Sequence, residues 1–92
     1  HKINENLKVV KNPNYGRQFP TPIGPIDLLC YDKKTKEFVV IEFKRSQVSD
    51  DTIGQILRYM GYVYLNMSKN NKPVRGIIVG SDFSEGNCDQ DR

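Results

Sequence analysis

The sequence predicts an α/β fold in which a helix connects two strands of one mixed β-sheet, and three observations support it. Residues 24–31 and 37–45 are apolar runs joined by a lysine-rich turn, a pattern typical of a β-hairpin. Apolar side chains then recur at helical spacing between residues 53 and 67. A short apolar segment, residues 74–80, follows the helix. Because a crossover helix normally returns the chain in parallel, the hairpin and this last strand together make a mixed sheet.

Two short strands are expected before the hairpin. Residues 7–10 can form the first and residues 17–19 the second, with the turn signal Asn-Pro-Asn-Tyr-Gly between them. Prolines within residues 20–25 then prevent regular ladder pairing. This irregular loop has two interpretations: a simple edge connection, or a place where the backbone at Gly24 comes close to a bound phosphate.

The helix has a clear start signal, since residues 49–52 (Ser-Asp-Asp-Thr) offer several N-caps. An apolar stripe follows at helical spacing, and a second stripe contains Gln55 and Tyr59. Gln55 is interpreted either as the capping-box partner of Thr52 or as a side chain that faces a functional site. Arg58 can bind a phosphate or pair with Asp50 or Asp51.

Carboxylates occupy hairpin positions where a structural hairpin would carry aliphatic side chains. A turn centred between Lys34 and Thr35 predicts three opposed pairs: Leu29 with Val40, Asp32 with Glu37, and Asp27 with Glu42. Side chains two apart share a strand face, so Lys44 lies on the face of Glu42. Because directly opposed like charges repel, the Asp27 and Glu42 pair predicts a bound cation between the strands.

Oxygen ligands of this kind suit a hard divalent ion, Mg²⁺ or Mn²⁺. A zinc site is not expected, because the chain has one histidine, at position 1, and two distant cysteines, Cys30 and Cys88. The structural alternative is an exposed strand face with ordinary Glu/Lys pairs. Both faces of the hairpin are apolar, as in a sheet covered on both sides, and charges embedded there need partners. The first face comprises Ile26, Leu28 and Cys30, and the second Leu29, Phe38 and Val40.

The ordered set Asp27, Glu42-Phe43-Lys44 and Gln55 with Arg58-Tyr59 resembles the D…ExK…QxxxY pattern of restriction-endonuclease-like nucleases. The stretches FPTPIGPIDLLCYDKKTKEFVVIEFKR, SDDTIGQILRYMGYV and VRGIIV are similar to the C-terminal catalytic domain of the NucS-type endonucleases, which act on branched or mismatched DNA. This resemblance spans residues 7–80 and is more specific than ExK alone.

The resemblance implies an αβββαβ core and phosphodiester cleavage that depends on a divalent metal. It implies metal ligation by Asp27, Glu42 and the Phe43 carbonyl, and a water-orienting role for Lys44. Gln55 joins the catalytic set, and the candidate nucleic-acid contacts are Gly24, Arg45, Arg58 and Tyr59. Such nucleases usually carry one more acid on a helix before the first strand. Only Glu5 is available here, so that helix is expected to be truncated.

Composition limits the architecture and the partners. With 92 residues we expect one small core domain over residues 1–80, followed by an acidic, flexible tail over residues 81–92. The core carries 13 Lys/Arg against 7 Asp/Glu, a modestly basic balance that fits DNA. The last strand is expected beside the strand of Asp27. Without a signal peptide or a membrane-length apolar run, the chain is expected to be a fragment of a soluble cytoplasmic protein that has no membrane partner.

The sequence therefore predicts a metal-dependent DNA endonuclease, with branched, mismatched or single-stranded DNA as candidate substrates. The alternative is a catalytically silent nucleic-acid-binding or assembly module with the same fold. A homodimer, or additional domains outside the fragment, would complete either assembly.

Overall fold

The computed structural model describes residues 6–10 and 16–80, and these contain five strands and one helix. In chain order the elements are β1 (Leu7–Val9), β2 (Arg17–Phe19), β3 (Ile26–Asp32), β4 (Glu37–Lys44), α1 (Asp50–Asn66) and β5 (Arg75–Gly80). The predicted tail, residues 81–92, and Glu5 lie outside the described residues. No described helix is long and apolar enough to span a bilayer.

The strands form one mixed sheet, as predicted. β3 pairs antiparallel with β4, and β5 pairs parallel with β4. β1 and β2 both pair antiparallel with the other edge of β3, one after the other along its length. The prediction that the last strand lies beside the strand of Asp27 is therefore wrong. Since β1 and β2 occupy the outer edge of β3, the parallel return of the chain can only extend the sheet beyond β4.

The αβββαβ order agrees with the structure only in its general α/β character. Its first helix falls on residues outside the described part of the chain. Among the described residues the order is β1-β2-β3-β4-α1-β5, with four strands before the helix. Two of these strands, β1 and β2, have three residues each and pair with the same edge of β3.

The hairpin register is the predicted one along most of its length. Leu29 is the partner of Val40, and Asp32 is the partner of Glu37. The ladder ends at Leu28 and Ile41, one pair before the predicted Asp27–Glu42 pair. The two strands therefore separate at the position where the carboxylates meet.

Strict alternation of side chains also fails at the start of β3. Ile26 packs in the same buried cluster as Leu29, three residues away, whereas the sequence grouped it with Leu28 and Cys30. In this region the β4 ladder has ended, and Gln18, opposite Asp27, has a left-handed backbone with φ of 48°. Here β3 has lost its β4 partner and keeps only the pairing with β2, which is irregular at Gln18, so its side chains depart from the two-residue period.

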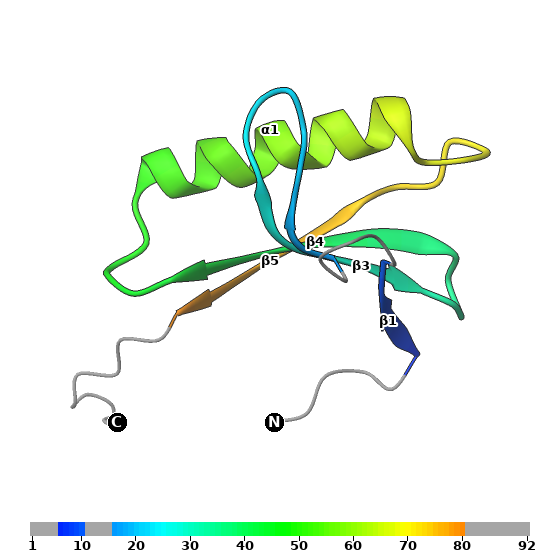
Figure 1. The fold of residues 1–92 in the computed structure, drawn as a ribbon, viewed down its shortest axis with the longest axis horizontal. Coiled ribbons are helices and arrows are strands. Elements are labelled where there is room, and N and C mark those ends of the chain that lie inside the picture. The colour runs from blue at the N-terminus through cyan, green and yellow to red at the C-terminus, as the bar shows by residue number, and fades with distance from the viewer. Residues whose placement is uncertain (1–5, 11–15, 81–92) are drawn as a thin grey trace.

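Helix α1 lies across one face of the sheet (Figure 1). Its N-cap is Ser49, whose hydroxyl accepts a hydrogen bond from the backbone N–H of Thr52. The helix residues buried against Ile26, Leu29 and Val40 are Ile56, Tyr59 and Val63. The buried stripe therefore runs through Tyr59, and three of the residues between 53 and 67 that were expected to form the apolar stripe are exposed: Ile53, Leu57 and Tyr64.

The opposite face of the sheet carries a second buried cluster of Cys30, Val39 and Ile41. Among the described residues α1 is the only helix, so a covering layer is described for one face alone. Phe43 and Val79, which are neighbours across β4 and β5, are 53% and 39% exposed.

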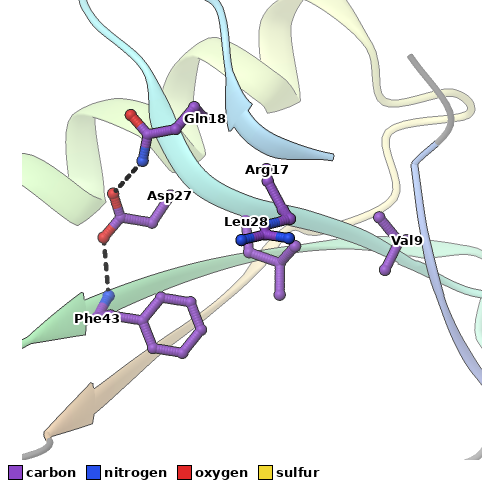
Figure 2. Close-up of a pocket in the computed structure, with 6 residues that line it drawn as sticks. All are labelled: Val9, Arg17, Gln18, Asp27, Leu28 and Phe43. Atoms are coloured by element: carbon purple, nitrogen blue, oxygen red, sulfur yellow. Dashed lines mark hydrogen bonds between the residues drawn. The ribbon is translucent and has the colours of Figure 1, made fainter. Parts of the chain in front are cut away.

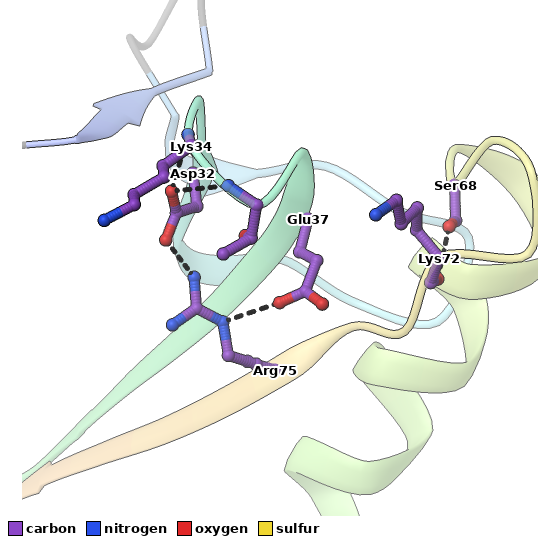
Figure 3. A network of polar contacts seen from close by, with 7 residues as sticks. Asp32, Lys34, Glu37, Ser68, Lys72 and Arg75 are labelled. Atoms are coloured by element: carbon purple, nitrogen blue, oxygen red, sulfur yellow. Dashed lines mark hydrogen bonds and ion pairs between the residues drawn. The ribbon is translucent and has the colours of Figure 1, made fainter.

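A charge network fixes the turn end of the hairpin (Figure 3). Asp32 is 1% exposed, and its carboxylate accepts hydrogen bonds from the N–H groups of Lys34 and Thr35 and from the Arg75 guanidinium. Arg75 also pairs with Glu37, with Nε and Oε1 3.1 Å apart. Burial by itself raises the pKa of Asp32, but these hydrogen bonds and the charge of Arg75 outweigh it and lower that pKa below its ordinary value.

Candidate active site

The carboxylates of Asp27 and Glu42 meet where β3 and β4 separate, and each is bound by the backbone of the other strand. Glu42 Oε2 accepts a hydrogen bond from the Asp27 N–H at 3.2 Å. Asp27 Oδ2 accepts one from the Phe43 N–H at 2.9 Å. Thus the Asp27 side chain takes the donor that a continuing ladder would have given to a β3 carbonyl. The β3–β4 ladder therefore ends at the position where the two carboxylates come together.

The environment of Glu42 makes its ionised form less favourable than it would be in water. Burial raises the pKa of Glu42, and the neighbouring charge of Asp27 raises it further, while the hydrogen bond from the Asp27 N–H acts in the opposite direction. A bound cation would reverse this preference, because it stabilises both carboxylates in their charged forms. Two adjacent acids with this property are a suitable donor set for a hard divalent ion.

The remaining predicted ligand is the backbone carbonyl of Phe43. In an antiparallel ladder the N–H and C=O of one residue point to the same neighbouring strand. Since the Phe43 N–H donates to Asp27, regular strand geometry would direct its carbonyl to the same side. Among the described residues no group of three His, Cys, Asp or Glu side chains could hold a metal, so a cation at this position would have at most two carboxylates and this carbonyl as protein ligands there. Mg²⁺ sites in proteins often use only one or two carboxylates, the rest being water and substrate phosphate.

Lys44 is the last residue of β4 and is partly buried, two residues after Glu42 on the same strand. Arg45 follows it and is exposed. Arg58 is exposed on α1 and forms no ion pair with Asp50 or Asp51. Both arginines therefore present their charge to solvent, where a phosphate can approach.

Gly24, Gln55 and Tyr59 form a second group of predicted site residues in contact. A Cβ atom at Gly24 would lie 2.8 Å from the Tyr59 hydroxyl oxygen, and Gly24 has φ of +122°. The amide of Gln55 donates a hydrogen bond to the Tyr59 hydroxyl at 2.9 Å. Helix α1 therefore supports the loop that leads into Asp27, and only glycine fits the close approach. Tyr59 itself is 2% exposed and packs in the core.

The observed cap excludes one of the two interpretations of Gln55, the capping-box partner of Thr52. With Ser49 as N-cap, the third helical residue is Thr52, so Gln55 lies one turn beyond the capping box. Its described hydrogen bond is to Tyr59.

Gln18 is a residue that sequence reasoning missed. Its side-chain amide donates a hydrogen bond to Asp27 Oδ1 at 3.3 Å, from β2 on the opposite side to Phe43 (Figure 2). A pocket of about 830 Å³ opens beside this contact; it is lined by Val9, Arg17, Gln18, Asp27, Leu28 and Phe43. The pairing of residues 17–19 with 26–28 would have placed Gln18 opposite Asp27, but three residues carry too weak a pattern to fix a register.

Comparison with known proteins gives a consistent match. The model of the Endonuclease NucS C-terminal domain matches residues 2–89. The chain is 38% identical over 69 residues to an Endonuclease NucS of Sulfolobus acidocaldarius, which covers 75% of this chain and 26% of the relative. It is 38% identical over 67 residues to that of Mycolicibacterium smegmatis, covering 73% of this chain and 28% of the relative.

A third relative, the Endonuclease NucS of Corynebacterium diphtheriae, is 41% identical over 63 residues, which are 68% of this chain and 26% of the relative. The chain thus matches about a quarter of the length of these curated relatives. No solved structure matches it. Since the family model extends over nearly the whole sequence, the chain belongs to the Endonuclease NucS C-terminal domain family.

Proposed function

We propose that this chain is a catalytic domain that hydrolyses DNA phosphodiester bonds with the help of a divalent cation. The observation that carries the proposal is the meeting of Asp27 and Glu42 at the point where β3 and β4 separate, with Lys44 two residues further along β4. The relatives are named endonucleases, which agrees with this chemistry.

The proposed cation is Mg²⁺ or Mn²⁺, held by Asp27, Glu42 and the Phe43 carbonyl. When bound, such an ion supplies charge stabilisation to the phosphodiester and a water that is easier to deprotonate. The Lys44 ammonium orients the attacking water or neutralises charge that develops on the phosphate. Arg45 and Arg58 bind neighbouring phosphates through their exposed guanidinium groups.

The roles proposed for the second group follow from its contacts. Tyr59 packs closely against Gly24, and Gln55 donates a hydrogen bond to the Tyr59 hydroxyl. These contacts keep the loop that enters β3 in position relative to Asp27. Gly24 lets the backbone approach the DNA without a side chain in between. The substrates we propose are branched, mismatched or single-stranded DNA, bound by this domain together with a second copy or further domains.

A cleavage assay tests the proposal. Labelled single-stranded, branched and mismatched DNA are incubated with the protein in Mg²⁺, in Mn²⁺ and in chelator. We expect cleavage only with a cation, and its loss in Asp27→Asn and in Glu42→Gln. Lys44→Met should keep metal binding, measured by calorimetry, and lose turnover, because an ammonium group does not ligate metal. Asp51→Asn, which neutralises an exposed acid on α1, serves as the matched control.

Two outcomes contradict the proposal. Cleavage in chelator that survives Asp27→Asn would show that the acids do not act through a cation. DNA binding without cleavage of any substrate under any metal condition would instead indicate a silent binding module with the same fold.

A further inference from the structure

Gln18 has an unusual backbone for a strand residue. It lies in β2 between Arg17 and Phe19, whose partners on β3 are Leu28 and Ile26. Its φ of 48° is in the left-handed region, which residues other than glycine, asparagine and aspartate seldom adopt. Such conformations persist where the surrounding structure enforces them, and they concentrate at functional sites. The conformation occurs here at the residue opposite Asp27.

The side chain of Gln18 completes the hydrogen bonding of the Asp27 carboxylate. Gln18 Nε2 lies 3.3 Å from Asp27 Oδ1, and the Phe43 N–H lies 2.9 Å from Oδ2. The two donors come from β2 and β4, the neighbours of β3 on its two sides (Figure 2). With both oxygens held, the carboxylate cannot rotate freely about its bond to Cβ.

The chemistry of the donor matters as much as its position. A carboxamide N–H fixes a carboxylate oxygen without neutralising its charge, whereas a lysine or arginine at the same place would compete with a cation. Carboxylates that ligate metals are commonly held by such second partners, and losing one typically costs about 10–100-fold in metal affinity or activity.

We propose that Gln18 is the positioning residue that orients Asp27 for the divalent cation, an inference that rests on the proposed function. Gln18 contacts neither the cation nor the DNA in this role. It acts through Asp27, and the left-handed backbone at Gln18 directs the amide toward that carboxylate.

Mn²⁺ binding without DNA, measured by calorimetry, tests this role with three variants. Gln18→Met keeps the length of the side chain and removes the donor, and we expect its affinity for Mn²⁺ to fall at least about 10-fold. Gln18→Asn suits the left-handed backbone but is one methylene shorter, so its affinity should fall by a similar factor. Gln18→Lys keeps a donor and adds a charge. It should melt no lower than the parent in chelator, yet still bind Mn²⁺ more weakly.

Two controls separate positioning from a general loss of structure. Lys36→Gly removes another left-handed non-glycine residue, at the turn end of the sheet, and should leave Mn²⁺ affinity unchanged. In the Asp27→Asn background, Gln18→Met should have no further effect on the response of the melting temperature to Mn²⁺. An additional loss in that background would show that Gln18 acts independently of Asp27.

The outcomes distinguish this inference from the proposed function. If the parent binds Mn²⁺ and Gln18→Met binds it equally well, the positioning role is wrong and the proposed function stands. If Gln18→Lys binds as tightly as the parent, any donor suffices and the argument from charge is wrong. If the parent binds no Mn²⁺, both the proposed function and the role of Gln18 are overturned.

Discussion

The two ends of the β3–β4 hairpin carry the same pair of acids, an aspartate on β3 and a glutamate on β4, and stabilise them differently. At the turn end, Asp32 and Glu37 are Cα partners and share the guanidinium of Arg75 from β5. At the open end, Asp27 and Glu42 lie just beyond the last ladder pair and are bound by uncharged donors. One pair shares a cation supplied by β5, and the other is held by backbone and amide N–H groups.

The pKa values of the two ends follow this difference. The Asp32 pKa is lowered, because its hydrogen bonds and Arg75 outweigh the effect of burial. The Glu42 pKa is raised, because burial and the charge of Asp27 outweigh the hydrogen bond that it accepts. Opposed acids alone are therefore no sign of a metal site. The nature of the donors around them distinguishes a structural pair from a candidate catalytic one.

Exchanging the acids for amides at each end should give the largest contrast. We expect Glu42→Gln to reduce DNA cleavage to the level seen in chelator, since it removes a charged ligand. Glu37→Gln should retain cleavage, because its partner Arg75 belongs to the turn end. Initial rates on the same substrate with Mn²⁺ measure both. Equal losses in the two variants would mean that the hairpin is needed as a whole and that its ends are not specialised.

Removing Arg75 should have the largest effect on folding. In Arg75→Met the almost fully buried Asp32 loses its cationic partner, and an uncompensated buried charge is strongly destabilising. We expect a lower melting temperature than for Arg45→Met, the control, because Arg45 is exposed and forms no described ion pair. Arg75→Met should still bind Mn²⁺ below its melting temperature. If the two variants melt alike, the turn-end network contributes little to stability.

The same comparison shows which features a sequence can reveal. The hairpin register followed from a local turn and from alternation over a few residues, and the structure confirms it through Leu28 and Ile41. Arg75 was not identified as the partner of Asp32, because the two are 43 residues apart and the last strand was predicted beside β3, whereas it pairs with β4. A crossover rule fixes the direction and handedness of the return, and the strand already lying on an edge decides its neighbour.

Near the candidate site, two features were not predicted from the sequence: the burial of Tyr59 and the contact of Gln18 with Asp27. The burial of Tyr59 was missed because Tyr59 was assigned to the second stripe with Gln55, and only the packed sheet decides which side of the helix faces inward. Gln18 was missed because its contact with Asp27 depends on a left-handed backbone that no pattern of hydrophobic residues encodes. Asp27, Glu42 and Lys44 were predicted as a site because charged residues within apolar strands break the expected pattern.

The pH dependence of stability should have opposite signs at the two ends. A lowered folded-state pKa at Asp32 contributes stability that is present above the unfolded pKa and lost as the pH falls through the folded pKa. A raised pKa at Glu42 contributes stability that is present at low pH and lost as the pH rises through the folded pKa.

Denaturant unfolding in chelator between about pH 3 and pH 6, the range of carboxyl titration, separates the two contributions. Asp32→Asn should weaken the loss of stability on the acid side. Glu42→Gln should remove the decrease in the free energy of unfolding that the parent shows as the pH rises toward neutral. If Glu42→Gln instead removes a gain of stability toward neutral pH, Glu42 is stabilised in its charged form and the repulsion at the open end is absent.

The smallest expected effect is the most specific test of the open end. Without a cation, the like charges of Asp27 and Glu42 repel each other, and Asp27→Asn removes this repulsion while keeping the size of the side chain and one acceptor oxygen. In chelator we expect Asp27→Asn to be at least as stable as the parent. Its free energy of unfolding should be higher by about 0.5–1 kcal/mol, the scale of one cross-strand pair. Mn²⁺ should raise the melting temperature of the parent and have a smaller effect on the variant, because only the parent gains the binding energy of an intact site. Melts of both proteins in chelator and across a manganese series decide between the outcomes. A variant that melts below the parent in chelator, or one that responds to Mn²⁺ as strongly as the parent, would show that the two carboxylates share no ion.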